Sequence, residues 1–305
     1  MNRRRFIATT LTGLASVSMA RRARAAQEAG PRAGAATLPT RTLGKAGPKV
    51  TVVGAGTGMS GTNRASNMTR LGPEAFDALL RHEYESGIRY FDCADSYGSH
   101  PYVARALKEF PREDYVLSTK IWVTPGGLPE PERPDADVVV ERFRKELNTD
   151  YIDLVLIHAM SDPEWTTSQR RQMDIMADLK AKGIIRAHGV SVHSLPALEA
   201  CVECEWVDSV HARINPYGDV MDDRDPEKVA AVLRRVHESG RGVVGMKLIG
   251  EGRYRNDPEK RDAAIAYALD LGCVDTMIVG FERPTEVDDF ITRVRAALST
   301  REPQA

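Results

Sequence analysis

The sequence predicts one α/β domain folded as a (β/α)8 TIM barrel, and three observations support this fold class. Short apolar segments alternate with amphipathic segments of helical length, which is typical of parallel strands joined by helices. Eight such strand segments fit within the roughly 250 residues that this barrel usually needs. Four amphipathic segments end at a glycine directly before an apolar run, at Gly87, Gly183, Gly240 and Gly272, and glycine closes helix ends because it adopts left-handed backbone angles. An open doubly wound sheet is the alternative architecture.

The individual elements are predicted in chain order. A β-hairpin over residues 41–51, with its turn at 44–47, is expected to lie beneath the barrel. Two later helices are expected to begin at Asp225 and Asp257, each of which is followed by proline. An aspartate caps unpaired backbone N–H groups, and a proline in the first turn needs no such partner. The barrel strands are predicted at residues 50–54, 90–94, 115–121, 152–158, 185–191, 209–214, 242–247 and 276–280.

The first 26 residues are interpreted as an export signal rather than as part of the domain. The sequence RRRFI at residues 3–7 is similar to the bacterial twin-arginine motif, and an apolar stretch and a small-residue cleavage site at 23–25 follow it. The apolar stretch is too short for a permanent span, which needs about 20 residues. We therefore expect export by the twin-arginine machinery to the periplasm or another extracytoplasmic space. The expected organisation is a signal peptide at 1–26, a flexible linker at 27–40, the barrel at 41–298 and a tail at 299–305.

The composition is that of an ordinary globular chain. Hydrophobic residues make up 42% and charged residues 28% of the 305 residues, and the formal net charge is −1. This balance lacks the basic excess that nucleic-acid binding usually requires. The four cysteines are too few for a disulfide scaffold in a chain of this length. We expect a small molecule as the partner, with no nucleic acid and no stable membrane anchor.

Polar residues at the ends of three consecutive predicted strands are the candidate catalytic groups. In a TIM barrel the catalytic side chains lie at the C-terminal strand ends and in the loops that follow. Asp92 lies at the end of the second strand and Tyr97 follows it. Lys120 ends the third strand, and His158 ends the fourth. The four side chains are therefore expected to meet at one rim of the barrel.

These residues and their spacing resemble the aldo-keto reductase family. Its pattern of Asp-x-Ala-x-x-Tyr-Gly, a strand-ending lysine, and Asp-Leu-x-Leu-x-His is matched at residues 92–98, at Lys120 and at residues 153–158. The resemblance implies a TIM barrel that uses NADPH or NADH to reduce the carbonyl of an aldehyde, ketone or sugar to an alcohol. It also implies that Trp122 lines the substrate pocket.

The chemistry of carbonyl reduction explains why these residue types occur together. The oxygen that gains negative charge needs a proton donor, which we expect to be Tyr97. A free tyrosine has a pKa of about 10, and a nearby cation is expected to lower it, which is the role we predict for Lys120. Asp92 would balance the buried charge of Lys120, and His158 would orient the substrate oxygen.

The resemblance also implies a set of cofactor contacts, several of which depart from the family pattern. Ser191 would hold the nicotinamide carboxamide, while Val192 replaces the asparagine that usually follows, His211 replaces a glutamine, and Met246 replaces a stacking aromatic residue. The implied cofactor-binding residues are Gly56, Thr57, Ser191, His211, Met246, Lys247, Leu248 and Gly250.

The choice between NADP and NAD stays open in the sequence. The family typically uses a lysine and an arginine to hold the 2′-phosphate of NADP, and Gly280 and Glu286 occupy those positions. An acidic residue there would repel the phosphate, although Arg283 lies close by in the sequence. The family resemblance favours NADP, whereas these residues favour NAD.

Three other interpretations compete with this one. The GxGxxG pattern from Gly56 to Gly61 invites a dinucleotide-binding Rossmann interpretation, but no helix-like segment opens directly after it. A metal-dependent TIM-barrel hydrolase would use His158, His193 and His211 as ligands. A non-catalytic barrel that binds nicotinamide is the third possibility, because the expected carboxamide and stacking positions are altered.

Overall fold

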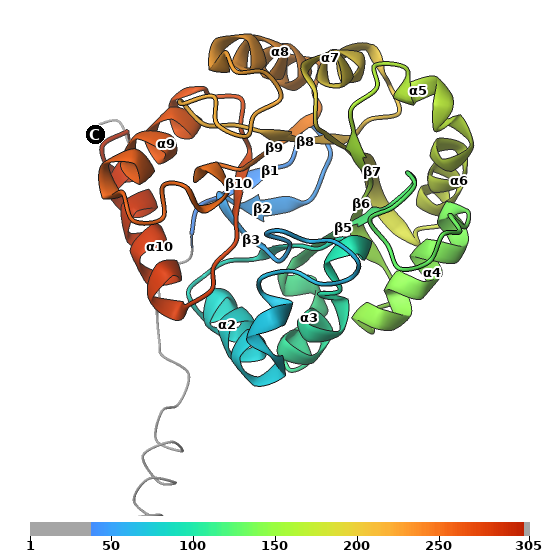
Figure 1. Cartoon of the computed structure of the whole chain (residues 1–305), viewed down its shortest axis with the longest axis horizontal. Helices are drawn as coiled ribbons and strands as arrows, with labels where there is room; N and C mark the ends of the chain where they lie inside the picture. Colours follow the sequence, from blue (N-terminus) through green and yellow to red (C-terminus); the bar gives the residue numbers. More distant parts are fainter. Residues whose placement is uncertain (1–37, 302–305) are drawn as a thin grey trace, which may run out of the picture. The chain divides into compact units, whose positions relative to one another are not determined.

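The computed structural model describes residues 38–301, and within this range eight parallel strands close a barrel surrounded by helices (Figure 1). The predicted fold class is confirmed. The predicted signal peptide, most of the predicted linker and the end of the predicted tail lie outside the described residues. The barrel strands are β3 Val53–Gly56, β4 Tyr90–Asp92, β5 Val116–Ile121, β6 Ile152–Met160, β7 Ile185–Val192, β8 Ser209–Arg213, β9 Gly242–Met246 and β10 Thr276–Val279.

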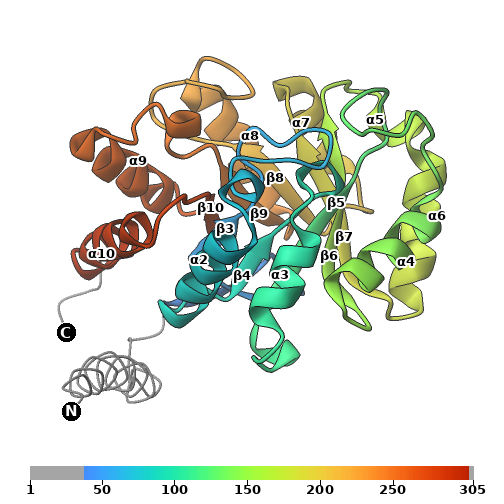
Figure 2. The same cartoon turned by 60° about the horizontal axis from the view of Figure 1, so that its bottom comes forward.

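The helices form a ring around the strands, and α10 closes this ring because it packs between α9 and α2 (Figure 2). No helix in the part of the chain that the structure describes is long and apolar enough to cross a bilayer. The helices are α2 Pro73–Glu85, α3 His100–Leu107, α4 Ala136–Leu147, α5 Trp165–Ser168, α6 Arg170–Ala181, α7 Leu195–Glu203, α8 Pro226–Glu238, α9 Pro258–Asp270 and α10 Pro284–Ser299.

The helix boundaries follow the predicted local chemistry. The Asp225 side chain accepts a hydrogen bond from the backbone N–H of Glu227, and Asp257 accepts one from Lys260, so both predicted caps are confirmed. The four predicted terminating glycines all have positive φ angles, between +67° and +104°. An L-residue with a side chain is strained in this region, which is why glycine ends these helices.

Two separate apolar cores stabilise the barrel. The larger core lies between the strands and the surrounding helices, and the smaller one fills the barrel interior. Leu43 and Val50 belong to the interior core although they come from the N-terminal hairpin. The hairpin therefore plugs one end of the barrel.

This hairpin consists of β1 Thr40–Thr42 and β2 Lys49–Thr51, and it lies beneath the barrel as predicted. Gly44 has a φ of +64° and its N–H donates to Asp275 Oδ2, directly before β10. One predicted boundary was wrong: the first barrel strand is β3 and not residues 50–54, because residues 49–51 pair with β1 in the hairpin. Because the hairpin covers the N-terminal strand ends, the functional groups belong to the opposite rim.

Glu83 is a buried acid whose ionisation is expected to destabilise the domain at high pH. Its side chain lies in α2 and is 2% exposed, and Oε2 has no hydrogen-bond partner among the described residues. Burial raises the pKa of Glu83 well above its ordinary value. The group is therefore neutral in the folded protein at a pH where it is charged in the unfolded chain.

We expect Glu83→Gln to stabilise the protein at pH 8 but to have little effect at pH 4. With a raised folded-state pKa, the wild type is most stable below the unfolded pKa and loses stability as the pH rises towards the folded value, by up to about 1.4 kcal/mol per unit. Glutamine does not ionise and removes this loss. Chemical denaturation of both proteins from pH 4 to 8 measures the effect, and a pH-independent difference between them would contradict the prediction.

Candidate active site

Asp92 and Lys120 form a buried ion pair at the C-terminal ends of β4 and β5. Lys120 Nζ donates to Asp92 Oδ2 at 2.6 Å and to the carbonyl of Cys93 at 2.8 Å. The lysine side chain is 1% exposed. Burial lowers the pKa of an ammonium group, but the neighbouring Asp92 and Tyr97 raise the pKa of Lys120 above its ordinary value. Lys120 is therefore a fixed cation at neutral pH.

Tyr97 and His158 meet beside this ion pair. Tyr97 lies in the one-turn helix η2 (Asp95–Tyr97) that follows β4, and His158 lies in β6. The Tyr97 hydroxyl is 3.5 Å from Nε2 of His158, and Lys120 Nζ is 5.0 Å from the centre of the Tyr97 ring. The structure thus brings together the four residues that the sequence placed at one rim.

The pKa of Tyr97 departs from the expectation. Burial raises it, the positive charge of Lys120 lowers it, and the net result lies above the ordinary value for tyrosine. The predicted lowering by Lys120 is therefore present but is outweighed by burial. A raised pKa keeps the phenol protonated at neutral pH, as a proton donor must be.

His158 is a neutral imidazole facing the tyrosine hydroxyl. Burial and the positive charge of Lys120 hold the pKa of His158 well below its ordinary value. Nδ1 of His158 and Nε1 of Trp122 are buried without a hydrogen-bond partner among the described residues. The Trp122 ring packs edge-on against His158 at 5.0 Å, so it forms a wall beside the polar pair. The polar pair of Tyr97 and His158 is therefore bounded on one side by an aromatic ring.

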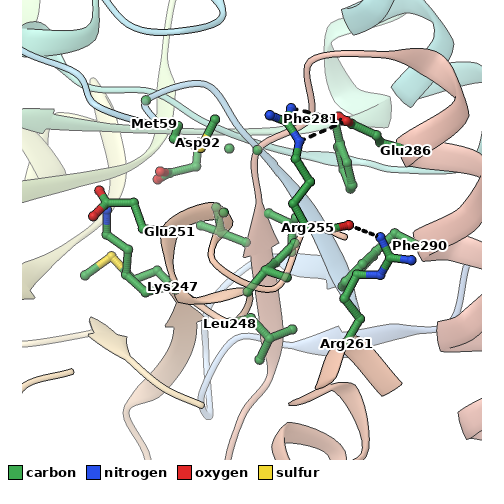
Figure 3. Close-up of a pocket in the computed structure, with 18 of the residues that line it drawn as sticks. Met59, Asp92, Lys247, Leu248, Glu251, Arg255, Arg261, Phe281, Glu286 and Phe290 are labelled. Carbon is green, nitrogen blue, oxygen red and sulfur yellow. Dashed lines mark hydrogen bonds and ion pairs between the residues drawn. The ribbon is translucent and has the colours of Figure 1, made fainter. Parts of the chain in front are cut away.

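A cleft leads from this group between the ends of β9 and β10 to helices α9 and α10 (Figure 3). It contains about 970 Å³ of space not filled by atoms and is open to solvent. Asp92 and Tyr97 lie at its inner end, and Arg261 and Phe290 line its outer part. Among the predicted cofactor residues, the cleft is lined by Gly56, Met246, Lys247 and Leu248.

The other predicted cofactor residues have different surroundings. Thr57 donates to the Asp92 carbonyl at 2.8 Å, and Ser191 accepts the N–H of Ala159 at 2.8 Å. His211 is fully buried, with Nε2 3.1 Å from the Tyr90 hydroxyl. Gly250 is adjacent to lining residues but itself faces the Tyr254 ring. These four side chains or backbone positions support the rim and do not line the cleft.

Two arginines that the sequence analysis did not single out line the cleft. Arg255 pairs with Glu282 at 2.5 Å and with Glu286 at 3.2 Å, and Arg261 pairs with Asp289 at 3.3 Å. Figure 3 shows Arg255 pointing to Glu286 across the cleft. Both arginines lie close in the sequence to Asp257, where a helix was predicted to begin, and they follow the segment that starts at Lys247. This position in the sequence is the feature that could have identified them as cleft residues.

Comparison with known proteins identifies the family. A model of the aldo/keto reductase family matches residues 52–263, well over half of the chain. The chain belongs to this family. The match includes all four clustered polar residues and the strands that carry them.

Individual relatives are distant. Methylglyoxal reductase DkgB from Salmonella typhimurium is 28% identical over 156 residues, which are 48% of this chain and 55% of that protein. Aldo-keto reductase str7 from Strobilurus tenacellus is 28% identical over 230 residues, 70% of this chain and 62% of that protein. The holo form of an aldo-keto reductase from Bacillus halodurans superposes with a TM-score of 0.66 at 20% identity, covering 88% of this chain and 97% of the other, and this likeness shows the shared fold.

The cleft of this aldo/keto reductase fits a nicotinamide dinucleotide. Lys247, Arg255 and Arg261 line it, and each is paired with an acid of the chain, so a bound pyrophosphate would have to share or replace these acidic partners. His158, whose Nε2 lies 3.5 Å from the Tyr97 hydroxyl, and the neighbouring Trp122 adjoin Tyr97 at the inner end of the cleft. Within residues 38–301, His158, His193 and His211 do not form a group of three side chains arranged to hold a metal, and no other His, Cys, Asp or Glu side chains there do so.

Proposed function

We propose that this protein reduces the carbonyl group of a small aldehyde or ketone to an alcohol, with NADH or NADPH as the hydride donor. The observation that carries this proposal is the position of the protonated Tyr97 hydroxyl, beside His158 and the Lys120–Asp92 pair, at the inner end of a cleft that fits a dinucleotide. Family membership agrees with it.

Each protein group has a distinct role in this reaction. The bound dinucleotide supplies the hydride to the carbonyl carbon. The carbonyl oxygen accepts hydrogen bonds from Tyr97 and the neutral His158, and it takes the Tyr97 proton as negative charge develops. Lys120 stabilises the phenolate that forms, and Asp92 holds Lys120 in place. The wall formed by Trp122 restricts the substrate to the space in front of the hydroxyl.

A direct assay tests this function. Because the relative DkgB is named a methylglyoxal reductase, methylglyoxal is the first substrate to test, followed by longer aldehydes, ketones and sugars. Oxidation of NADH or NADPH at 340 nm should depend on the carbonyl compound. If the protein binds the dinucleotide by calorimetry but oxidises it with none of these compounds, a non-catalytic binding role replaces the proposal.

We propose further that the protein prefers NADH to NADPH. Each cation that lines the cleft is already paired with an acid of the chain, including Lys247 with Glu251 at 2.6 Å. Burial raises the pKa of Glu286, but the N–H of Glu282 and nearby arginines lower it below the ordinary value, so Glu286 is an anion. A 2′-phosphate entering this part of the cleft would meet unfavourable charge. Gly280 supplies no cation to this part of the cleft, and the atom nearest to a Cβ there would be the terminal methyl of Met68, at 2.3 Å.

We expect Glu286→Gln to increase NADPH affinity by about tenfold, equivalent to about 1.4 kcal/mol, with little change for NADH. The amide keeps an oxygen for the Glu282 N–H but removes the negative charge. Asp288→Asn is the matched control, because it removes one charge from the same helix outside the cleft lining. Calorimetric titration of both nucleotides measures the effect. An equal gain in the two variants, or a wild type that binds NADPH more tightly, would reject the preference.

We also propose that residues 1–26 direct export through the twin-arginine pathway. The basic RRRFI motif, the apolar stretch and the cleavage site support this localisation. In a bacterium with this pathway, the wild type should accumulate outside the cytoplasm as a shortened chain, while Arg3→Lys with Arg4→Lys should remain inside at full length. Export of both forms alike would contradict the proposal, and fractionation followed by mass spectrometry of the N-terminus distinguishes the outcomes.

A further inference from the structure

The glycine-rich segment at residues 56–61 has an unexpected neighbour, the ring of Tyr97. A Cβ placed on Gly58 would lie 2.1 Å from Cε2 of this ring, and one on Gly61 would lie 2.3 Å from Cδ1. Neither glycine has a positive φ, so backbone conformation does not explain them. The two glycines are required by the close approach of the loop to the tyrosine ring.

Asp95, two residues before Tyr97, fixes the turn that carries the tyrosine. Its carboxylate is 2% exposed and accepts hydrogen bonds from Arg64 Nε at 3.0 Å and from Arg142 Nη2 at 2.6 Å. Arg64 belongs to the loop after β3, and Arg142 belongs to α4. One buried carboxylate therefore ties three separate parts of the chain together beside Tyr97.

The loop and the turn also interlock through their backbones. A Cβ on Gly98, the residue after Tyr97, would lie 2.0 Å from the Arg64 carbonyl oxygen. Beyond Arg142 the network continues to Glu146 at 2.9 Å, from Glu146 to His100 at 2.7 Å, and from His100 to Thr119 at 2.7 Å. Thr119 directly precedes Lys120 in β5, so the network connects the turn carrying Tyr97 with the strand carrying Lys120.

We propose that Gly58, Gly61 and the Arg64–Asp95–Arg142 cluster position the phenol of Tyr97 against Lys120 and His158. The two glycines provide a flat surface for the ring, and the cluster holds the turn against that surface. These are positioning residues, and their effect on turnover rests on the proposed function, whereas their contact with the ring does not.

A double-mutant cycle tests the contact between Gly58 and the Tyr97 ring without measuring activity. Gly58→Ala should lower the melting temperature by several degrees in the wild-type background, because the added methyl group displaces the ring. In a Tyr97→Ala background the same substitution should have no destabilising effect, since the space is vacant. Gly126→Ala is the control: its φ of +72° strains alanine, but its Cβ would meet nothing, so its cost should be equal in both backgrounds. An equal cost of Gly58→Ala in both backgrounds would overturn the proposed contact.

The role of the Arg64–Asp95–Arg142 cluster is tested by measuring the kinetics of Arg64 variants. Arg64 is 31% exposed, so it can be replaced without leaving a cavity in the core. Arg64→Gln should lower kcat by about 10- to 100-fold through misplacement of the hydroxyl, with dinucleotide affinity unchanged. Arg64→Lys keeps the charge facing Asp95 and should recover part of this loss. Arg171→Gln, which breaks an exposed pair with Asp135, is the control and should behave as wild type.

A failure of this positioning proposal can be distinguished from a failure of the proposed function. An unchanged kcat in Arg64→Gln, or a loss confined to dinucleotide affinity, would refute the proposal that the Arg64–Asp95–Arg142 cluster positions Tyr97. If the wild type reduces no carbonyl compound, the proposed function fails, but the stability cycle at Gly58 and Tyr97 still decides whether the ring is held as described. Coupling in that cycle together with a lowered kcat in Arg64→Gln would support the whole proposal.

Discussion

Tyr97→Phe is expected to lower kcat for carbonyl reduction by about 100- to 10,000-fold, the usual contribution of a positioned proton donor. Phenylalanine keeps the ring between Gly58, Gly61 and His158 and removes only the hydroxyl. Dinucleotide affinity and the melting temperature should therefore change little. Steady-state kinetics at saturating dinucleotide, combined with calorimetric binding, separate the loss of the proton donor from a loss of binding.

Tyr102→Phe provides the matched control for this substitution. Tyr102 lies in α3 and packs against Phe76, away from the cleft lining. It should retain wild-type turnover. If Tyr97→Phe also retained full activity while still binding the dinucleotide, another group would have to supply the proton and the assignment of Tyr97 would be wrong.

Lys120→Met is expected to abolish turnover and to destabilise the fold by about 3–5 kcal/mol. Asp92 would then lose its 2.6 Å partner while buried, and the phenolate that forms at Tyr97 would lose its neighbouring cation. Chemical denaturation measures the stability and dinucleotide oxidation measures the activity. Because Lys120→Met leaves Asp92 as an uncompensated buried charge, its effect on turnover needs to be separated from its effect on stability.

The double variant Lys120→Met with Asp92→Leu separates these two effects. Removing both charges eliminates the unpaired carboxylate, so much of the lost stability should return. Turnover should stay abolished, because the cation beside Tyr97 is still missing. A double variant as unstable as Lys120→Met would show that the pair stabilises the barrel beyond mutual compensation, and an active one would exclude Lys120 from the reaction.

Several features could be predicted from the sequence because they depend on local chemistry. Helix caps at Asp225 and Asp257 and the terminating glycines follow from backbone donors and φ angles within a few residues. The first barrel strand was misplaced because Val50 and Thr51 are both β-branched, as barrel-strand residues often are, and only pairing with β1 assigns them to the hairpin.

The clustering of the four polar residues at one rim was predictable for a related reason. In a closed parallel barrel all strands end at the same rim, so Asp92, Lys120 and His158 had to lie near one another once the fold class was known. The direction of the pKa shift of Tyr97 was not predictable in this way, because it depends on how completely the surrounding chain excludes water.

The sequence by itself thus determined the barrel, its caps and the clustering of Asp92, Tyr97, Lys120 and His158, since each follows from local periodicity or from the single rim of the fold. Only the tertiary structure decided which side chains face the cleft: it directs Thr57 and His211 into supporting hydrogen bonds and brings Arg255 opposite Glu286. These contacts join segments far apart in the chain. The partners in these contacts are determined by how the segments pack together, which no local sequence pattern specifies.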